Sequence, residues 1–290
     1  MDKEVVLFVG ATTIDIHYLV ENFPQSNSKV KAGDFAITVG GPATNAAITH
    51  SFLGGSGELW SVIGKNPFHD FISKELSRFR IHHYDIGSNK DSYPGISAII
   101  TTEITGDRSV IYQAARYTKL VDNYLDNLRR MKYDLVLVDG LLMEASIEIA
   151  RLAQQAGTPV VLDAGSWKED MDRLLPYISI AICSEDFLPP ETSNYFDVFR
   201  YLEAQGIKDI CISRGNRSLL YKTPDDTGEI PVREVRVVDT LGAGDILHGA
   251  FCYHYLKNQN FFEALKKASE IATESCRYFG TRSWMNIYRS

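Results

Sequence analysis

The sequence has little of what marks several large classes of protein. Its 290 residues include only four cysteines, which stand far apart at Cys183, Cys211, Cys252 and Cys276. None forms the Cys-x-x-Cys pair with nearby histidines that a zinc site requires, so we expect reduced, packed thiols. No apolar stretch approaches the ~18 residues of a membrane span, and the chain runs from its start into a strand-like segment. These absences predict a cytoplasmic protein with no membrane partner.

Positive charge is also scarce. The formal net charge is −7, and lysine and arginine never form a run longer than a pair. Surfaces that bind nucleic acids are strongly basic, so we expect no nucleic acid partner. A small molecule is the favoured ligand.

Several common nucleotide and metal motifs are missing. Gly64-Lys65-Asn66 lacks both the upstream glycine and the Ser or Thr of a Walker A loop. Gly10-Ala11-Thr12 follows the first apolar run where a dinucleotide-binding protein would have Gly-x-Gly-x-x-Gly. The histidines offer no His-Glu-x-x-His, and His82-His83 is predicted to lie in a solvated loop. Phosphates therefore need another kind of cradle.

The apolar pattern predicts an α/β protein. Hydrophobic residues make up 44% of the chain and charged residues 23%, as expected for a globular protein with a large core. Short continuous apolar runs, typical of strands buried on both faces, occur at 5–9, 135–138, 160–162, 178–182 and 210–212. Helix-like segments separate many of them, which indicates a mostly parallel sheet covered by helices.

A second pattern predicts a smaller sheet. Segments near residues 12–20, 34–40, 95–103 and 108–114 alternate β-branched and polar residues, as half-exposed strands do. They are scattered through the first 115 residues, so they extend the main fold instead of forming a domain of their own. No linker-like tract divides the chain. We expect one domain over residues 1–290, with these segments as a lid over a site.

The strongest chemical signal is Val237-Val238-Asp239-Thr240-Leu241-Gly242-Ala243-Gly244-Asp245, followed by an amphipathic run. It predicts a strand, a turn of small residues and a helix. Backbone N–H groups of Gly242, Ala243 and Gly244 at a helix start can face an anion. Asp245 beside them would be within reach of a hydroxyl that loses its proton. The alternative is that Asp245 caps its helix and the glycines make a tight turn.

A second signal is Gly40-Gly41-Pro42-Ala43-Thr44-Asn45, which leads into another helix. Pro42 suits a first helical turn. The glycines allow a ligand to lie against the backbone, and the Asn45 amide can both donate to and accept from a sugar hydroxyl. A plain strand-to-helix turn with a solvated asparagine is the alternative.

Together the two segments resemble the two signatures of the ribokinase (PfkB) family of carbohydrate kinases, in the same order and with similar spacing. The resemblance extends from Gly10 and Asp15 to Gly280. It implies a three-layer αβα sandwich with a mostly parallel central sheet and a small β lid. The implied activity is the ATP-dependent phosphorylation of a sugar hydroxyl, with Mg²⁺ accompanying ATP.

The resemblance also assigns roles to residues. Asp245 would deprotonate the acceptor as general base, and the backbone of Gly242 to Gly244 would form the anion hole. Residues that bind the sugar would be Asp15, Gly41 and Asn45. For Asp15, an exposed loop position is the alternative to an inward carboxylate that accepts sugar hydroxyls.

Nucleotide contacts are implied at two further places. Similar kinases bind the nucleotide in the loop that here carries Arg214, Gly215 and Asn216, although a hairpin turn alone also explains these residues. Gly106-Asp107-Arg108-Ser109 resembles the lid turn of the ketohexokinase-like branch, whose arginine reaches the phosphates. An exposed hairpin arginine is the alternative for Arg108.

The chain departs from the family at the metal motif. Many members carry Asn-x-x-Glu after the strand that here ends at Cys183, whereas this chain has Ser184-Glu185-Asp186-Phe187. Glu185 or Asp186 would take part in binding Mg²⁺, or ATP oxygens would largely support it. Asp239 matches a position that helps to hold K⁺ in some relatives, and its alternative role is to anchor the turn.

Two other functions remain open from the sequence alone. A nucleoside kinase of the same fold would need an apolar slot for a base beside the sugar site, and a catalytically silent sugar-binding regulator would tolerate the altered 184–187 segment. Lid strands carry unpaired edges, and relatives often bury their lids against a second subunit, which implies a homodimer.

Overall fold

The computed structural model describes residues 4–87, 92–117, 119–121, 124–130 and 132–288. Its main element is a nine-stranded sheet with the order β13-β12-β11-β10-β9-β8-β1-β4-β5. Neighbouring strands from β11 to β5 run parallel, whereas β12 and β13 extend one edge in antiparallel fashion. The strands are β1 (Val5–Val9), β4 (Ser56–Ser61), β5 (His82–Asp85), β8 (Leu135–Val138), β9 (Val160–Ala164), β10 (Ile180–Ser184), β11 (Asp209–Arg214), β12 (Arg217–Lys222) and β13 (Thr227–Ile230).

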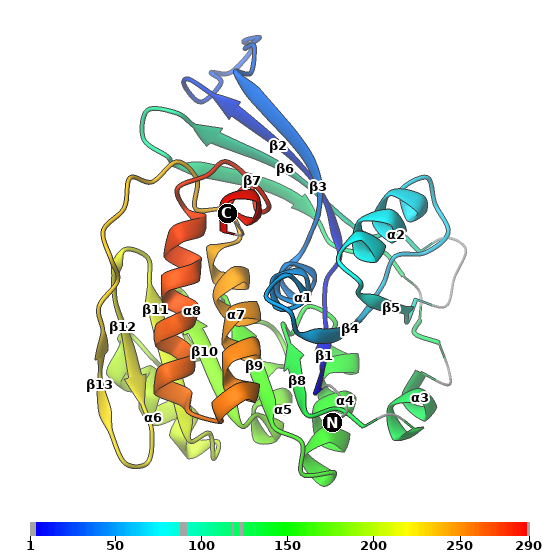
Figure 1. Cartoon of the computed structure of the whole chain (residues 1–290), viewed down its shortest axis with the longest axis vertical. Coiled ribbons are helices and arrows are strands. Elements are labelled where there is room, and N and C mark those ends of the chain that lie inside the picture. Colours follow the sequence, from blue (N-terminus) through cyan, green and yellow to red (C-terminus); the bar gives the residue numbers. More distant parts are fainter. Residues whose placement is uncertain (1–3, 88–91, 118, 122–123, 131, 289–290) are drawn as a thin grey trace.

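Helices cover both faces of this sheet (Figure 1). Side chains that alternate along β1 enter two separate cores: Phe8 belongs to the core that contains residues of α1, α7 and α8, and Leu7 to the core that contains residues of α4, α5 and α6. Because both faces of β1 and β8 are buried, every side chain along these strands is apolar. The predicted α/β sandwich is confirmed. The helices are α1 (Pro42–Phe52), α2 (His69–Arg78), α3 (Tyr124–Arg130), α4 (Met143–Gln155), α5 (Met171–Leu174), α6 (Tyr195–Ala204), α7 (Ala243–Asn258), α8 (Phe261–Ser275) and α9 (Met285–Tyr288), with a 3₁₀ turn η1 (Leu175–Tyr177).

A second sheet stands at one end of the large one (Figure 1). It has the order β3-β2-β6-β7, formed by β2 (Thr13–Val20), β3 (Asp34–Gly40), β6 (Gly95–Thr102) and β7 (Arg108–Gln113). β2 begins a few residues after β1 ends, and β3 runs directly into α1, so the sheet is attached where the parallel strand β1 ends. These strands coincide with the four alternating segments of the sequence.

The two faces of the second sheet differ in character. One face presents Asp15, His17 and Ser97, all buried. The other face carries the cross-strand neighbours Phe35 and Tyr18, and Ile37 and Ile16, with Ile37 half exposed and Phe35 more so. Alternation along each strand therefore separates a polar inner face from an apolar outer face.

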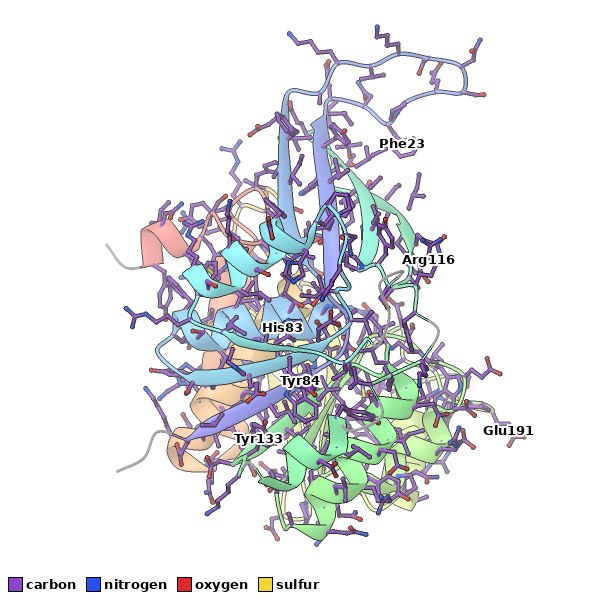
Figure 2. The ribbon with its side chains drawn as sticks, turned by 90° about the vertical axis from the view of Figure 1, so that its right-hand side faces the viewer. Phe23, His83, Tyr84, Arg116, Tyr133 and Glu191 are labelled. Atoms are coloured by element: carbon purple, nitrogen blue, oxygen red, sulfur yellow. The ribbon has the colours of Figure 1, made fainter. Side chains whose placement is uncertain are left out.

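The histidine pair at residues 82 and 83 corrects one sequence prediction. These residues do not lie in a solvated loop but in the edge strand β5, which pairs with β4 (Figure 2). His83 Nε2 is 2.9 Å from Ser61 Oγ, and burial lowers the pKa of His83 to about 4. The pair lacks the apolar alternation by which a strand is recognised in a sequence. His82 is exposed, and His83 is half-buried through its contacts with β4.

No helix in the described part of the chain combines the length and the apolar character that a membrane span needs. The four cysteines carry free thiols, with Cys276 half-buried and the others buried.

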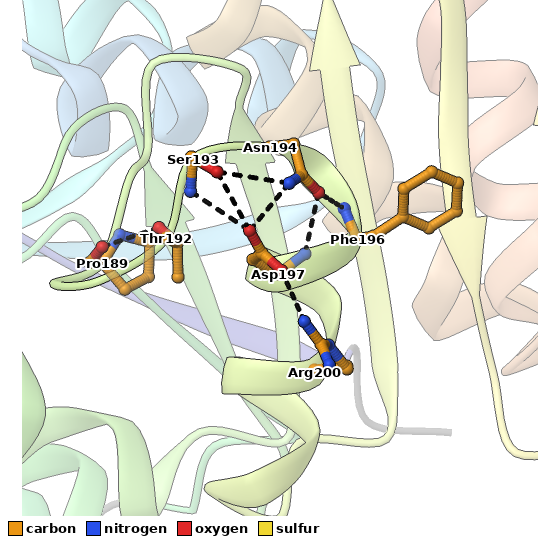
Figure 3. A network of polar contacts seen from close by, with 7 residues as sticks. All are labelled: Pro189, Thr192, Ser193, Asn194, Phe196, Asp197 and Arg200. Atoms are coloured by element: carbon orange, nitrogen blue, oxygen red, sulfur yellow. Dashed lines mark hydrogen bonds and ion pairs between the residues drawn. The ribbon is translucent and has the colours of Figure 1, made fainter.

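Helix α6 begins with a polar network on the molecular surface (Figure 3). The Asn194 side-chain oxygen accepts hydrogen bonds from the N–H groups of Phe196 and Asp197, at 3.0 and 3.2 Å. The Asp197 carboxylate in turn accepts from Asn194 Nδ2 and from Arg200. These bonds satisfy donors that a helix start otherwise leaves without an intrahelical partner.

Replacing Asn194 with alanine removes this cap. We expect Asn194→Ala to lower the free energy of unfolding by about 1 kcal/mol, because Phe196 and Asp197 lose their acceptor. Urea denaturation measures the change. The control is Asn286→Ala, at an exposed position in α9, where we expect a change within about 0.5 kcal/mol. Equal losses in both variants would contradict a capping role for Asn194.

Candidate active site

The turn before α7 opens the candidate site. Gly242 precedes the helix with φ 69°, a left-handed conformation that side chains disfavour, and a Cβ placed there would lie 2.7 Å from Thr281 Cγ2. Gly244 is exposed, and a Cβ placed on it would meet nothing within 4 Å. The first turn of a helix leaves its N–H groups without intrahelical acceptors. Open space around Gly244 therefore gives an anion access to these donors.

Asp245 lies in the same first turn of α7 and is half-buried. Its Oδ2 accepts a hydrogen bond from Asn45 Nδ2 at 2.7 Å. Burial, followed by the negative charge of Asp163, raises the pKa of Asp245 to about 7, and the charge of Asp15 acts in the same direction. The hydrogen bond from Asn45 and the charge of His248 oppose this shift. A carboxylate that titrates near neutral pH is suited to accept and release a proton.

Asn45 reaches Asp245 because α1 and α7 cross closely. Gly249 of α7 lies against the backbone of α1, where an added Cβ would be 2.2 Å from the carbonyl oxygen of Ala46. At the start of α1, Gly41 has φ 96°, and its carbonyl accepts the Asn45 N–H at 2.8 Å. A Cβ on Gly41 would be 2.4 Å from the carbonyl oxygen of Ala11. Asn45 is buried, so it is not a solvated asparagine.

Asp15 belongs to the polar inner face of the second sheet. It is buried on β2, and its Oδ1 accepts from Thr13 Oγ1 at 2.7 Å. Burial raises the pKa of Asp15, whereas hydrogen bonds from Thr13 and Ser97 and the charge of Arg282 lower it. The exposed loop position considered from the sequence does not occur. The structure thus brings together predicted residues from β2, α1 and α7.

Four site residues escaped the sequence reasoning. Arg282 donates a hydrogen bond to Asn45. Asp163, near the end of β9, has its Oδ2 3.4 Å from Nδ1 of His248 in α7. Asp139 directly follows β8 and accepts from the N–H groups of Ala11 and Leu141, each at 2.8 Å. None of these residues stands in a motif. The only available signal was that Asp139 and Asp163 follow apolar strand runs, at the carboxyl edge of a parallel sheet.

Asp239 anchors the turn that precedes Gly242. Its Oδ1 accepts from the Leu241 N–H at 2.9 Å, and its Oδ2 accepts from the Gly280 N–H at 2.8 Å. Arg108 of β7 donates to the hydroxyl of Thr240 in the same turn. The second sheet therefore touches the segment that leads into the candidate anion cradle, which is the backbone of Gly242 to Gly244 at the start of α7.

A cavity of about 460 Å³ adjoins this cradle. Gly215 and Asn216 line it on one side and Ala243 and Gly244 on another, with apolar walls from Val232, Val235, Val237, Leu219, Leu247, Ala272 and Cys276. Arg214 lies in the adjoining strand, and its guanidinium turns back to the carbonyl of Ser218 at 2.8 Å and to Glu229. A larger cavity, of about 930 Å³, lies beside α8 and contains none of the predicted site residues.

The altered metal segment shows no prepared metal site. Glu185 is ion-paired with Arg217, and Asp186 is exposed. Phe187, in place of the family's glutamate, is buried against Trp167 with ring centroids 5.7 Å apart. Among the residues that the structure describes, no three His, Cys, Asp or Glu side chains gather closely enough to hold a metal ion.

Comparisons with known proteins agree on one family. Residues 3–287 match the family model described as pfkB family carbohydrate kinase. A deoxyribokinase of Salmonella typhi is 22% identical in an alignment 294 positions long, which covers 96% of this chain and 94% of that protein. The structure resembles ribokinase from Giardia lamblia with a TM-score of 0.85 at 18% identity, covering 98% of this chain and 96% of the other. It also resembles Arabidopsis thaliana ribokinase complexed with ribose and ATP, with a TM-score of 0.77 at 19% identity and complete coverage of both chains, 100% each.

The two glycines of the cradle should respond differently to alanine. We expect Gly242→Ala to lower the free energy of unfolding by about 1–2 kcal/mol, because its φ is left-handed and Thr281 is close. Gly244→Ala should be neutral or stabilising by up to about 1 kcal/mol, since its helical position has open space. Denaturant unfolding measures both. A loss at Gly244 as large as that at Gly242 would contradict the described geometry.

Proposed function

Because the chain belongs to the pfkB family of carbohydrate kinases, we propose that it transfers the γ-phosphoryl group of ATP to a sugar hydroxyl. Asp245 acts as general base, and the backbone of Gly242, Ala243 and Gly244 is the anion hole. The observation that most supports this is the position of Asp245, next to the exposed Gly244 in the first turn of α7 and with a pKa raised to about 7. Proton acceptor and anion cradle are then adjacent, as in-line phosphoryl transfer requires.

The acceptor sugar binds beneath the second sheet, between Asp15, Gly41 and Asn45. Asp15 accepts hydrogen bonds from sugar hydroxyls, and Asn45 holds Asp245 by one oxygen, which leaves Oδ1 for the reacting hydroxyl. As the acceptor oxygen bonds to the γ-phosphorus, its proton moves to Asp245 and the bond from the γ-phosphorus to the bridging oxygen breaks. ADP leaves with that oxygen.

The nucleotide occupies the 460 Å³ cavity beside the cradle. Its apolar walls suit an adenine ring, and the backbone of Gly215 and Asn216 approaches the nucleotide from the β11–β12 turn. The Arg214 side chain is engaged within its own hairpin, so its contribution is to hold the turn. Arg108, beside Thr240, is positioned to contact phosphate oxygens from the second sheet.

Among the residues that the structure describes, those of the 184–187 segment do not fit a side-chain magnesium site. Glu185 is neutralised by Arg217 and Phe187 offers no oxygen, so the Mg²⁺ that accompanies ATP would take its ligands from phosphates and water. Asp239 already accepts two backbone N–H groups. We therefore propose it as the anchor of the turn and not as a potassium ligand.

Asp245→Asn tests the assignment of the base. The variant keeps the shape of the side chain but cannot accept the proton, so we expect turnover to fall roughly 10²-fold or more. Coupled measurement of ADP release with pentoses, ketohexoses and nucleosides gives the rates. Thermal shifts with the same compounds and an ATP analogue report binding, which should persist. The control is Asp225→Asn, at an exposed aspartate between β12 and β13.

The outcomes separate the candidate functions. Unchanged turnover in Asp245→Asn would exclude Asp245 as the base. Ligand-dependent stabilisation of the wild-type protein without any turnover would instead identify a silent sugar-binding regulator. Turnover with nucleosides alone would identify a nucleoside kinase.

The apolar outer face of the second sheet supports a homodimer. Phe35, Ile37 and Ile111 are exposed by 62%, 50% and 69%, and contiguous exposed apolar surface commonly marks an interface. A second copy of the same face would cover it in an isologous contact.

Charged substitution tests this interface. We expect Ile37→Lys to convert a dimer to a monomer in light scattering coupled to size exclusion, because two like charges would meet at the two-fold axis. The control is Ile287→Lys on α9, where the isoleucine is exposed by 52%. A wild-type monomer at micromolar concentration would rule out the dimer.

A further inference from the structure

Arg282 enters the acceptor site from the C-terminal segment that follows α8. Its side chain is only 13% exposed. One terminal nitrogen, Nη2, donates to the carbonyl of Val39 at 2.7 Å and to Asn45 Oδ1 at 2.9 Å. The other, Nη1, reaches the carbonyl of Thr281 at 3.3 Å, and the ring of Phe79 lies 5.9 Å from the guanidinium carbon. The guanidinium is thus held in one place by contacts from several elements.

These contacts determine which way the Asn45 amide points. An arginine can only donate hydrogen bonds, so the amide oxygen of Asn45 must face it. The amide nitrogen then faces Asp245, to whose Oδ2 it donates at 2.7 Å. With the amide reversed, an NH₂ group would meet the arginine and an oxygen would meet the carboxylate, and both contacts would be repulsive. Arg282 therefore fixes the direction of the two hydrogen bonds that connect it through Asn45 to Asp245.

Arg282 is also a positive charge among carboxylates. Glu75 Oε1 is 3.7 Å from its Nε, which is buried and has no hydrogen-bond acceptor in the described residues. Burial lowers the pKa of Arg282 to about 10, while Glu75, Asp15 and Asp245 oppose that shift. The guanidinium accordingly stays protonated through the neutral range. Its positive charge interacts with two carboxylates of the site, Asp15 and Asp245.

The remaining charges around Asp245 act largely against its ionisation. Asp163 on β9 and Asp15 on β2 repel a negative charge at this position, and His248 on α7 opposes them. Asn45 on α1 contributes a neutral hydrogen bond, whose orientation depends on Arg282. Without Arg282, the ionised form of Asp245 would lose both an oriented donor and a nearby cation.

We propose that Arg282 is a positioning residue of the kinase reaction: it orients Asn45 so that one oxygen of Asp245 is held and the other faces the acceptor hydroxyl, and its charge favours the carboxylate form. The inference rests on the proposed function, because it assumes that Asp245 accepts the proton. Arg282 belongs to neither of the two sequence signatures. The role follows from the contacts that the fold gives it.

The test compares pH profiles of kcat/KM for wild-type and variant enzymes. In the wild type, the acid limb should have its midpoint near the pKa of Asp245, about 7. In Arg282→Met, loss of the cation raises that pKa, so the limb should move up by roughly one pH unit. In Arg282→Lys, the charge remains but the forked donor is lost. Its limb should stay in place while kcat falls at every pH.

Glu75→Gln provides a variant that keeps Arg282. Glu75 lies on α2, contacts Nε of Arg282 and not the Nη2 that donates to Asn45, and partly offsets the charge of Arg282. Removing that negative charge leaves Arg282 more effective, so the acid limb should move to lower pH, opposite to the shift in Arg282→Met. A loss of folding stability alone cannot produce shifts of opposite sign. The matched control is Arg277→Met, whose arginine pairs with Glu274 near the surface, and its limb should not move.

Coupling to Asn45 completes the test. If Arg282 acts through Asn45, the combined variant Arg282→Met, Asn45→Ala should lose less activity than the product of the single losses. Multiplicative losses, or unmoved limbs in both Arg282→Met and Glu75→Gln, would overturn the proposal. If Arg282→Met does not fold, Glu75→Gln alone decides it. A wild type without kinase activity would refute the proposed function instead, which keeps the two failures distinct.

Discussion

The close crossing of α1 and α7 is the constraint on which the candidate site depends. Gly249 has no side chain to separate the two helices, so the carbonyl of Ala46 approaches its Cα directly. At that distance Asn45, near the start of α1, can reach Asp245, near the start of α7. α1 follows β3 of the second sheet and α7 follows the turn that Asp239 anchors, and the crossing of the two helices brings their starts together. The hydrogen bond between them is therefore a product of helix packing.

Electrostatics within the site follow from the same packing. Carboxylates at positions 15, 163 and 245 come from three different elements and are brought into one poorly solvated space. Burial, together with repulsion from Asp163 and Asp15, works against the ionisation of Asp245 and raises its pKa to about 7. A neutral amide, a histidine and a buried guanidinium offset part of that effect. The balance among these groups, more than any one of them, suits Asp245 to the role of general base that we propose for it.

The sequence was informative where structure is local. Continuous apolar runs predicted the buried strands, and alternation predicted the second sheet, because strand periodicity depends on neighbouring residues. Glycine-rich segments before Asn45 and Asp245 indicated helix starts open to ligands. Arg282 and Asp163 were missed because their roles come from contacts with residues far away in the chain, and His83 was misplaced because its burial comes from β4. Contacts between residues that are far apart in the chain produce no sequence pattern from which they could be predicted.

The hydrogen bond between Asn45 and Asp245 joins residues 200 positions apart. During synthesis, the sheet strands and α1 emerge from the ribosome long before α7 and Arg282, so Asp15 and Asn45 are made early, whereas the proposed phosphate cradle, Asp245 and Arg282 are made late. A nascent chain that has not yet reached residue 242 would carry the proposed sugar-binding residues of β2 and α1 without the proposed phosphate cradle. The order of the elements along the chain thus delays completion of the site until α7 and Arg282 have been made.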